Sequence, residues 1–89
     1  MLASHDELTA RAESRIGRVL GERWRLDRVL GVGGMACVYA ATHTNNQREA
    51  AIKVLHRELA QNEQLKKRFL REGYIANKVS HSGVVTIVD

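Results

Sequence analysis

The sequence has few of the residues that cross-link a chain, rigidify it or bind metal ions. It has no proline, and its single cysteine, Cys37, excludes an internal disulfide bond. Its four histidines lie too far apart for a recognisable zinc pattern: His5, His43, His56 and His81. A lone cysteine fits a reducing compartment, so we expect a cytoplasmic protein.

A long apolar run is absent from the first twenty residues. This segment, MLASHDELTARAESRIGRVL, mixes acidic and basic side chains and has neither a signal core nor a membrane-spanning stretch. We therefore predict no membrane contact from this segment. An anchor further along a longer protein stays open.

Aromatic residues are scarce, which bears on nucleic-acid binding. The chain has one Trp, two Tyr and one Phe, so few bases could be stacked. The net charge of +4 comes from 14 basic and 10 acidic residues, and part of it lies in one segment: Lys66, Lys67, Arg68 and Arg71. Because charge on one helix face is usually solvated, we predict no nucleic-acid partner.

Size and composition set the class of protein. Eighty-nine residues with 44% hydrophobic and 27% charged side chains are typical of one small globular domain or part of a larger one. Nothing in this balance favours disorder or a fibrous repeat.

The N-terminal segment predicts a leader helix followed by a strand. Ser4 and Glu7 have the spacing of a capping box. Apolar residues then recur near the helical period, at Leu8, Ala12, Ile16, Val19 and Leu20. From Trp24 the pattern WRLDRVLG alternates, which predicts a strand with Trp24, Leu26 and Leu30 on one face.

The rest of the chain predicts two strands, a helix and a last strand. ACVYAAT and REAAIKVL favour extended chain, with a turn at Asn45 and Asn46 between them. Asn62 is a suitable cap for the helix EQLKKRFLREGYIANKV. SHSG then ends the helix, and VVTIVD begins the last strand. The helix stripe expected to face the core is Leu65, Phe69, Glu72, Ile75, Ala76 and Val79.

Residues 29–41, VLGVGGMACVYAA, hold three of the seven glycines within four positions. Glycine-rich turns bind phosphates because backbone N–H groups can approach anionic oxygens closely. A P-loop is excluded because no Gly-Lys pair is present, and a dinucleotide fingerprint is disfavoured because strand, not helix, follows the glycines. A glycine hairpin over phosphates remains, beside the alternative of a plain tight turn.

Two charged residues fall in the inward phase of their predicted elements. Lys53 interrupts an apolar strand, and Glu72 lies on the apolar stripe of the helix. An unpaired ion in a core is costly, so we predict that the two side chains meet. A register error or a long lysine reaching back to water is the alternative.

From about Trp24 to Asp89 the chain resembles the N-terminal lobe of protein kinases, most closely the bacterial serine/threonine kinases related to the eukaryotic ones. The resemblance rests on the order and spacing of LGVGGMACVYAA, AAIKVL and RFLREGYIANKVSHSGVVTIVD. It implies an α+β fold, an incomplete kinase-like N-lobe with an antiparallel sheet and one packed C-helix. We expect residues 1–22 to be the leader and residues 23–89 the partial lobe.

The resemblance also implies roles for individual residues. Lys53 would bind the α- and β-phosphates of ATP, and Glu72 would hold Lys53 through a charge pair that must assemble for activity. Val38 and Ala51 would pack against the adenine ring, with simple core packing as the alternative. A lid above the triphosphate would be formed by Gly31, Val32, Gly33, Gly34, Met35 and Ala36. Ala36 departs from the family pattern, which has a third glycine there.

Two kinase segments are absent from the sequence. A kinase uses a base aspartate in an HRD-type loop and a magnesium-holding aspartate in DFG. Asp6, Asp27 and Asp89 match neither motif, so we expect no metal ligand here and the magnesium ligands in a missing C-terminal lobe. Transfer of the ATP γ-phosphate to protein Ser/Thr hydroxyls would then belong to the complete polypeptide, not to this fragment. The alternative is a non-catalytic nucleotide-sensing or regulatory kinase-like module.

Overall fold

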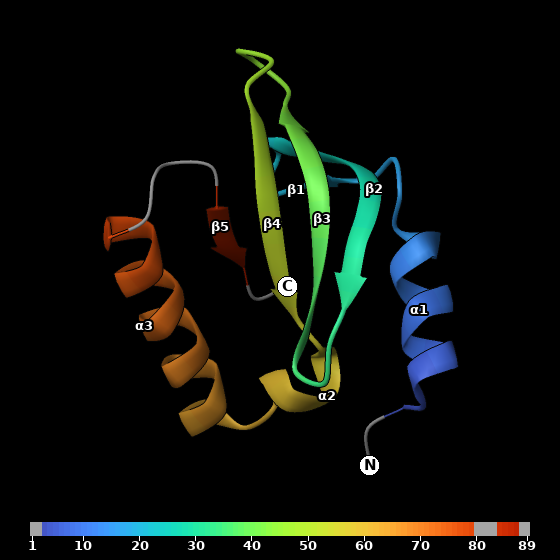
Figure 1. The fold of residues 1–89 in the computed structure, drawn as a ribbon, viewed down its shortest axis with the longest axis vertical. Helices are drawn as coiled ribbons and strands as arrows, with labels where there is room; N and C mark the ends of the chain where they lie inside the picture. Colours follow the sequence, from blue (N-terminus) through green and yellow to red (C-terminus); the bar gives the residue numbers. More distant parts are fainter. Residues whose placement is uncertain (1–2, 80–83, 88–89) are drawn as a thin grey trace.

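The computed structural model describes residues 3–79 and 84–87. These residues form a five-stranded sheet and three helices, which confirms the α+β class. The strands, in their order in the sheet, are β1 (Val19–Leu20), β2 (Trp24–Val32), β3 (Ala36–His43), β4 (Glu49–Leu55) and β5 (Val84–Ile87). The helices are α1 (His5–Ser14), α2 (Arg57–Ala60) and α3 (Glu63–Val79). Figure 1 shows α1 beside β2 and α3 beside β5, at opposite ends of the sheet.

The sheet is antiparallel from β1 to β4, but β5 joins β4 in parallel. The prediction of a wholly antiparallel sheet is therefore wrong for this last pair. The reason is the connection between the two strands. The chain leaves the C-terminal end of β4, passes through α2 and α3, and begins β5 beside the N-terminal half of β4. A helical crossover of this kind is the usual connection between parallel neighbours.

One face of the sheet carries the hydrophobic core. Tyr39 on β3 and Ile52 on β4 are each 0% exposed, and their strands alternate between this face and the other. Helix α1 adds Ala12 to the same core. The buried cluster consists of Ala12, Leu20, Leu26, Cys37, Tyr39, Ala41, Ile52 and Val54.

The leader forms a helix as predicted, but a shorter one than its apolar pattern indicated. The Ser4 hydroxyl accepts a hydrogen bond from the Glu7 N–H and caps the helix, and Leu8 and Ala12 are buried. The helix ends at Ser14, and the chain then turns through Gly17, whose φ is 93°. The prediction is consequently wrong for Ile16 and Val19, both of which are exposed.

The alternation predicted for β2 is interrupted. Leu26 is 0% exposed, whereas Leu30 is 49% exposed instead of sharing its face. The pairing of β2 with β3 shifts register between Leu26 and Arg28 and again between Val29 and Gly31. Each shift adds a residue to one strand and so reverses the facing of the residues after it. Val29 packs against the core in place of Leu30.

Two sets of polar contacts attach helix α1 to the rest of the structure. The buried Tyr39 hydroxyl donates to the Ala12 carbonyl at 3.0 Å, and burial raises the pKa of Tyr39. The Arg11 guanidinium binds both carboxylate oxygens of Glu58 on α2, at 3.0 and 2.8 Å. The leader is thus an integral part of this structure, attached to both β3 and α2.

The Arg11–Glu58 pair predicts an acid-dependent loss of stability. Its hydrogen bonds lower the pKa of Glu58 from 4.5 to about 2. Because the folded pKa lies below the unfolded one, this stabilisation is present above pH 4.5 and is lost as the pH falls toward about 2. We expect Glu58→Gln to reduce the fall in the free energy of unfolding between pH 5 and pH 2, measured by urea denaturation at both pH values.

Arg11→Gln is the matched variant and should remove part of the Glu58 contribution to the pH dependence, because the hydrogen bond from Arg11 is the largest cause of the lowered pKa and a backbone hydrogen bond also contributes. Part of the pH dependence of the free energy of unfolding should remain in both variants. Asp27 supplies it, since hydrogen bonds from Thr42 and Arg25 lower its pKa as well. If the free energy of unfolding of Glu58→Gln fell between pH 5 and pH 2 as much as that of the wild type, the Arg11–Glu58 pair would not form in solution.

The second half of the chain follows its predicted caps and turns. The Asn62 side chain accepts from the N–H groups of Gln64 and Leu65 at the start of α3, and Leu65 and Phe69 are half-buried. The β3–β4 connection turns at residues 44–46, as predicted from its two asparagines. No helix in the described ranges is long and apolar enough to cross a membrane. The SHSG segment, residues 88–89 and the side chains of Ile75, Ala76 and Val79 lie outside the part of the chain that the structure describes.

Candidate functional site

The glycine-rich turn joins two paired strands and does not open a helix. Gly31 pairs with Val38 and Val32 with Cys37 across β2 and β3. The turn closes with a hydrogen bond of 2.8 Å from the Gly33 N–H to the Ala36 carbonyl. This is the strand–turn–strand arrangement expected of a glycine hairpin.

The backbone of this turn does not itself require glycine. None of Gly31, Gly33 and Gly34 has a positive φ, in contrast to Gly17 and Gly21. A Cβ atom at Gly31 or Gly34 would meet nothing within 4 Å, and one at Gly33 would make only an ordinary contact of 3.4 Å. Turn geometry therefore gives no reason for three glycines. What they provide is open space above the backbone, where an anion could approach the N–H groups.

Four of the residues assigned to nucleotide binding share one face of the sheet, namely Gly31, Val38, Ala51 and Lys53, whereas Val32 packs against the core cluster. Gly31, Val38 and Lys53 are cross-strand partners in a single row, and side chains in one row point the same way. Ala51 lies two residues from Lys53 and therefore faces the same side. It lines an open hollow of about 460 Å³ together with Leu30 and Ala40. Met35, within the turn, is 43% exposed.

Lys53 and Glu72 do not point into the core, so that part of the sequence interpretation is wrong. Lys53 is exposed on the face opposite Ile52 and Val54, which are buried in the core cluster. Periodicity indicated correctly that Lys53 and Ile52 lie on opposite faces. It could not indicate which face the core occupies.

Glu72 is also solvated, and it pairs within its own helix. Its side chain is 64% exposed and accepts a hydrogen bond from the Arg68 guanidinium at 3.0 Å. An exposed pair four residues apart keeps both charges hydrated, whereas a buried pair must give up that hydration. In the described part of the chain no ion pair joins Lys53 to Glu72.

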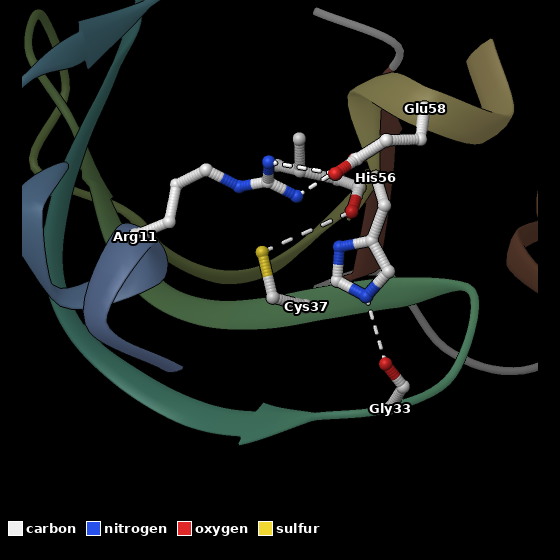
Figure 2. A network of polar contacts seen from close by, with 6 residues as sticks. Arg11, Gly33, Cys37, His56 and Glu58 are labelled. Atoms are coloured by element: carbon white, nitrogen blue, oxygen red, sulfur yellow. Dashed lines mark hydrogen bonds and ion pairs between the residues drawn. The ribbon is translucent and has the colours of Figure 1, made fainter. Parts of the chain in front are cut away.

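His56 contacts the turn and was not singled out from the sequence. It follows β4 directly and is 5% exposed. Its ring Nε2 lies 2.7 Å from the Gly33 carbonyl oxygen, and its backbone N–H donates to the Met35 carbonyl at 2.9 Å. Figure 2 shows the imidazole directed at Gly33, with the Arg11–Glu58 pair close by. No local pattern signals a contact between residues 23 positions apart.

The row of Gly31, Val38 and Lys53 offers no side chain that would hold a magnesium ion. Residues 3–79 and 84–87 contain no group of three His, Cys, Asp or Glu residues that could hold a metal ion. Mg²⁺ is held by one or two carboxylates together with phosphates and water, and no carboxylate lies in the Gly31–Val38–Lys53 row. The three residues of this row therefore do not fit a magnesium site.

Comparison with known proteins gives consistent matches over the same region. The protein kinase domain family matches residues 24–89. A probable serine/threonine-protein kinase PknB of Corynebacterium glutamicum is 42% identical over 71 residues, which cover 80% of this chain and 11% of that protein. Serine/threonine-protein kinase PrkC of Bacillus subtilis is 39% identical over 74 residues, covering 83% of this chain and 11% of that protein.

A third relative, serine/threonine-protein kinase PknD of Chlamydia pneumoniae, is 44% identical over 66 residues, covering 74% of this chain and 7% of that protein. The chain thus spans about a tenth of the length of the curated relatives it matches. The matched region contains the glycine-rich turn, Lys53 and α3, in the order of the kinase motifs. With a bare glycine hairpin set in line with an exposed lysine, and with these matches, the chain belongs to the protein kinase domain family, as an N-lobe fragment of a bacterial serine/threonine kinase.

Proposed function

We propose that the chain is the ATP-binding lobe of a serine/threonine protein kinase. In the complete protein it would serve transfer of the ATP γ-phosphate to protein Ser or Thr hydroxyls, and the fragment alone would not catalyse this reaction. The observation that carries the proposal is the glycine-rich turn, whose backbone does not need glycine and whose row also holds Lys53. A turn kept free of side chains next to an ammonium group suits a polyphosphate.

The residue roles follow from this face of the sheet. The lid over the phosphates would be residues 31–36, with N–H groups directed at oxygen atoms. Lys53 would neutralise charge on the α- and β-phosphates, and Val38 and Ala51 would contact the adenine. The hollow beside Ala51 supports the assignment of Ala51; Val38 does not line it, and Asp27, Arg28 and Glu49 are among its other lining residues.

Glu72 would pair with Lys53 only in the active arrangement of the complete kinase. For this, Glu72 must leave Arg68. An exposed ion pair four residues apart contributes only about 0.3–0.5 kcal/mol, so the exchange of partners costs little. Mg²⁺ ligands and the catalytic base would come from residues outside this chain.

Several broader expectations belong to the same proposal. We place the boundary between leader and partial lobe at residues 22 and 23, although α1 packs on the sheet. The single buried cysteine suits a cytoplasmic protein. Neither a nucleic acid nor a membrane is proposed as a partner of this segment.

A non-catalytic nucleotide-sensing module is the second candidate. One observation favours it: Lys53 and Glu72 are both exposed and Glu72 is engaged by Arg68, so the pair that activity requires is not assembled. Such a module would bind ATP and act by docking on a partner.

The test is phosphoryl transfer by the complete protein that contains this chain. Incubated with [γ-³²P]ATP, magnesium and a mixture of proteins, it should place label on serine and threonine, identified after acid hydrolysis. Nucleotide binding without any transfer would support the sensing module instead. Absence of both binding and transfer would refute the two candidates together.

A further inference from the structure

We infer that His56 is a positioning residue for the glycine-rich turn and that the leader helix α1 supports it through the Arg11–Glu58 pair. We call the Arg11–Glu58 pair, together with the contacts of His56 to Gly33 and Met35, the leader–turn network. Figure 2 shows Arg11, Glu58, His56 and Gly33 of this network. The role of this network in ATP binding rests on the proposed function. The effect of the network on the position of the turn is independent of that function.

His56 holds the turn on both sides of its tip. The Gly33 carbonyl lies before the tip and receives the ring, while the Met35 carbonyl lies after it and receives the backbone N–H. A carbonyl oxygen can only accept, so the Nε2 atom of His56 must carry the hydrogen. His56 is 5% exposed, which shields both bonds from competition by water.

The turn has few other means of holding its place. Gly33 and Gly34 have no side chains, and Met35 is largely exposed at 43%. Within the turn, the Gly33 N–H to Ala36 carbonyl bond fixes its shape but not its direction relative to β4. Ala36 pairs with Leu55 at the end of β4, and the His56 contacts extend this attachment to Gly33 and Met35 beyond the last paired residue.

The position of His56 is in turn fixed from α1. His56 is the N-cap residue of α2, and Glu58 lies two residues further on. Arg11 grips the Glu58 carboxylate with two hydrogen bonds, and both side chains are partly buried, at 21% and 24% exposed. The neighbouring Ala12 carbonyl is held by Tyr39 on β3, the strand that leaves the turn. Helix α1 is thus bonded both to β3, which follows the turn, and to α2, which follows His56.

The leader lies outside the region matched by the kinase family, since that match begins at residue 24. A segment before the domain would therefore set the geometry of the phosphate lid. Residues 1–22 would tune how well the lobe binds ATP without touching the nucleotide.

The first test compares steady-state kinetics of His56 variants in the complete kinase. His56→Leu removes the ring donor, and we expect the KM for ATP to rise about fivefold with kcat changed less than about twofold. His56→Gln retains an N–H donor of similar reach and should restore the KM to within about twofold of the wild type. His43→Leu removes an imidazole at the far end of the same hairpin and should leave the KM unchanged.

A second measurement does not depend on ATP. Amide hydrogen exchange of this chain should become faster at Gly33 and at the amide of residue 56 in His56→Leu, and remain slow at Ile52 and Val54. Uniformly faster exchange across the sheet would show that His56 merely stabilises the fold, and it would overturn the positioning role. If His56→Leu does not fold, His56→Asn replaces it, because its amide is too short to reach Gly33.

The leader is tested with Arg11→Gln. We expect a rise in the KM for ATP of about twofold to threefold and faster exchange at the turn. The double charge reversal Arg11→Glu with Glu58→Arg should recover part of the loss. Arg25→Gln breaks the exposed Arg25–Asp27 pair and is the matched control without effect on the turn.

The outcomes separate this inference from the proposed function. If transfer by the complete protein is abolished in Lys53→Met but His56→Leu leaves both the KM and the exchange at the turn unchanged, the inference is wrong and the function stands. If the protein neither binds nor transfers phosphate from ATP but exchange at the turn responds to His56 and Arg11, the network holds and the function is wrong.

Discussion

Lys53→Met in the complete kinase should reduce phosphoryl transfer at least about 100-fold, the loss typical when a charge-stabilising group of an active site is removed. Methionine has an unbranched side chain of similar length and removes the charge. The fold should survive, because Lys53 is exposed and lies on the face of β4 opposite the core. The rate is measured with [γ-³²P]ATP, and the fold with circular dichroism and a thermal melt.

Lys67→Met is the matched control for this experiment. Lys67 is an exposed lysine on α3, away from the glycine-rich turn, and its loss should leave the rate unchanged. Near-normal turnover of Lys53→Met would remove the assigned role of Lys53. It would also remove the reason for placing the triphosphate under the turn.

Leu26→Ala should have the largest effect on stability, lowering the free energy of unfolding by about 3 kcal/mol. Leu26 is 0% exposed in the core cluster, so truncation leaves a cavity among Tyr39, Ile52 and their neighbours. A domain of this size has a total stability of about 5–10 kcal/mol, so this loss would be a large part of it. Urea denaturation of the chain, followed by circular dichroism, measures the change.

The control is Leu30→Ala, on the same strand and chemically identical. Because Leu30 is 49% exposed, its truncation should cost less than about 1 kcal/mol. Equal effects of the two variants would mean that β2 alternates regularly and that its two register shifts do not exist in solution.

Leu26 and Leu30 also show what the sequence could and could not predict about β2. The pattern WRLDRVLG predicts a strand beginning at Trp24, and that is correct. It treats Leu26 and Leu30 as equivalent because a regular strand repeats every two residues. The bulges that separate them depend on pairing with β3 and leave no mark in the local pattern.

Features governed by local chemistry were predictable. The caps at Ser4 and Asn62 were correctly identified, since a capping side chain bonds backbone groups two or three residues away. Helix α2, with four residues, and strand β1, with two, are too short to show a period and were not predicted. The parallel pairing of β5 was missed because it depends on the whole crossover and not on any local pattern.

The candidate site was predictable as a set of residues but not as a geometry. Gly31, Val38 and Lys53 do share one row, as strand periodicity allows. The choice between solvent and core for Lys53 and Glu72 depends on what covers each face. Arg68, one turn before Glu72, offered a local partner that the stripe pattern ignored.

His56 also has a consequence for protein engineering. As the N-cap of α2 it makes no side-chain capping bond, because its ring is directed at Gly33. Asp, Ser or Asn at this position would cap α2 and add about 1 kcal/mol. A thermostability design guided by helix statistics would therefore replace His56, but losing its buried contact with Gly33 would offset the added cap and release the turn.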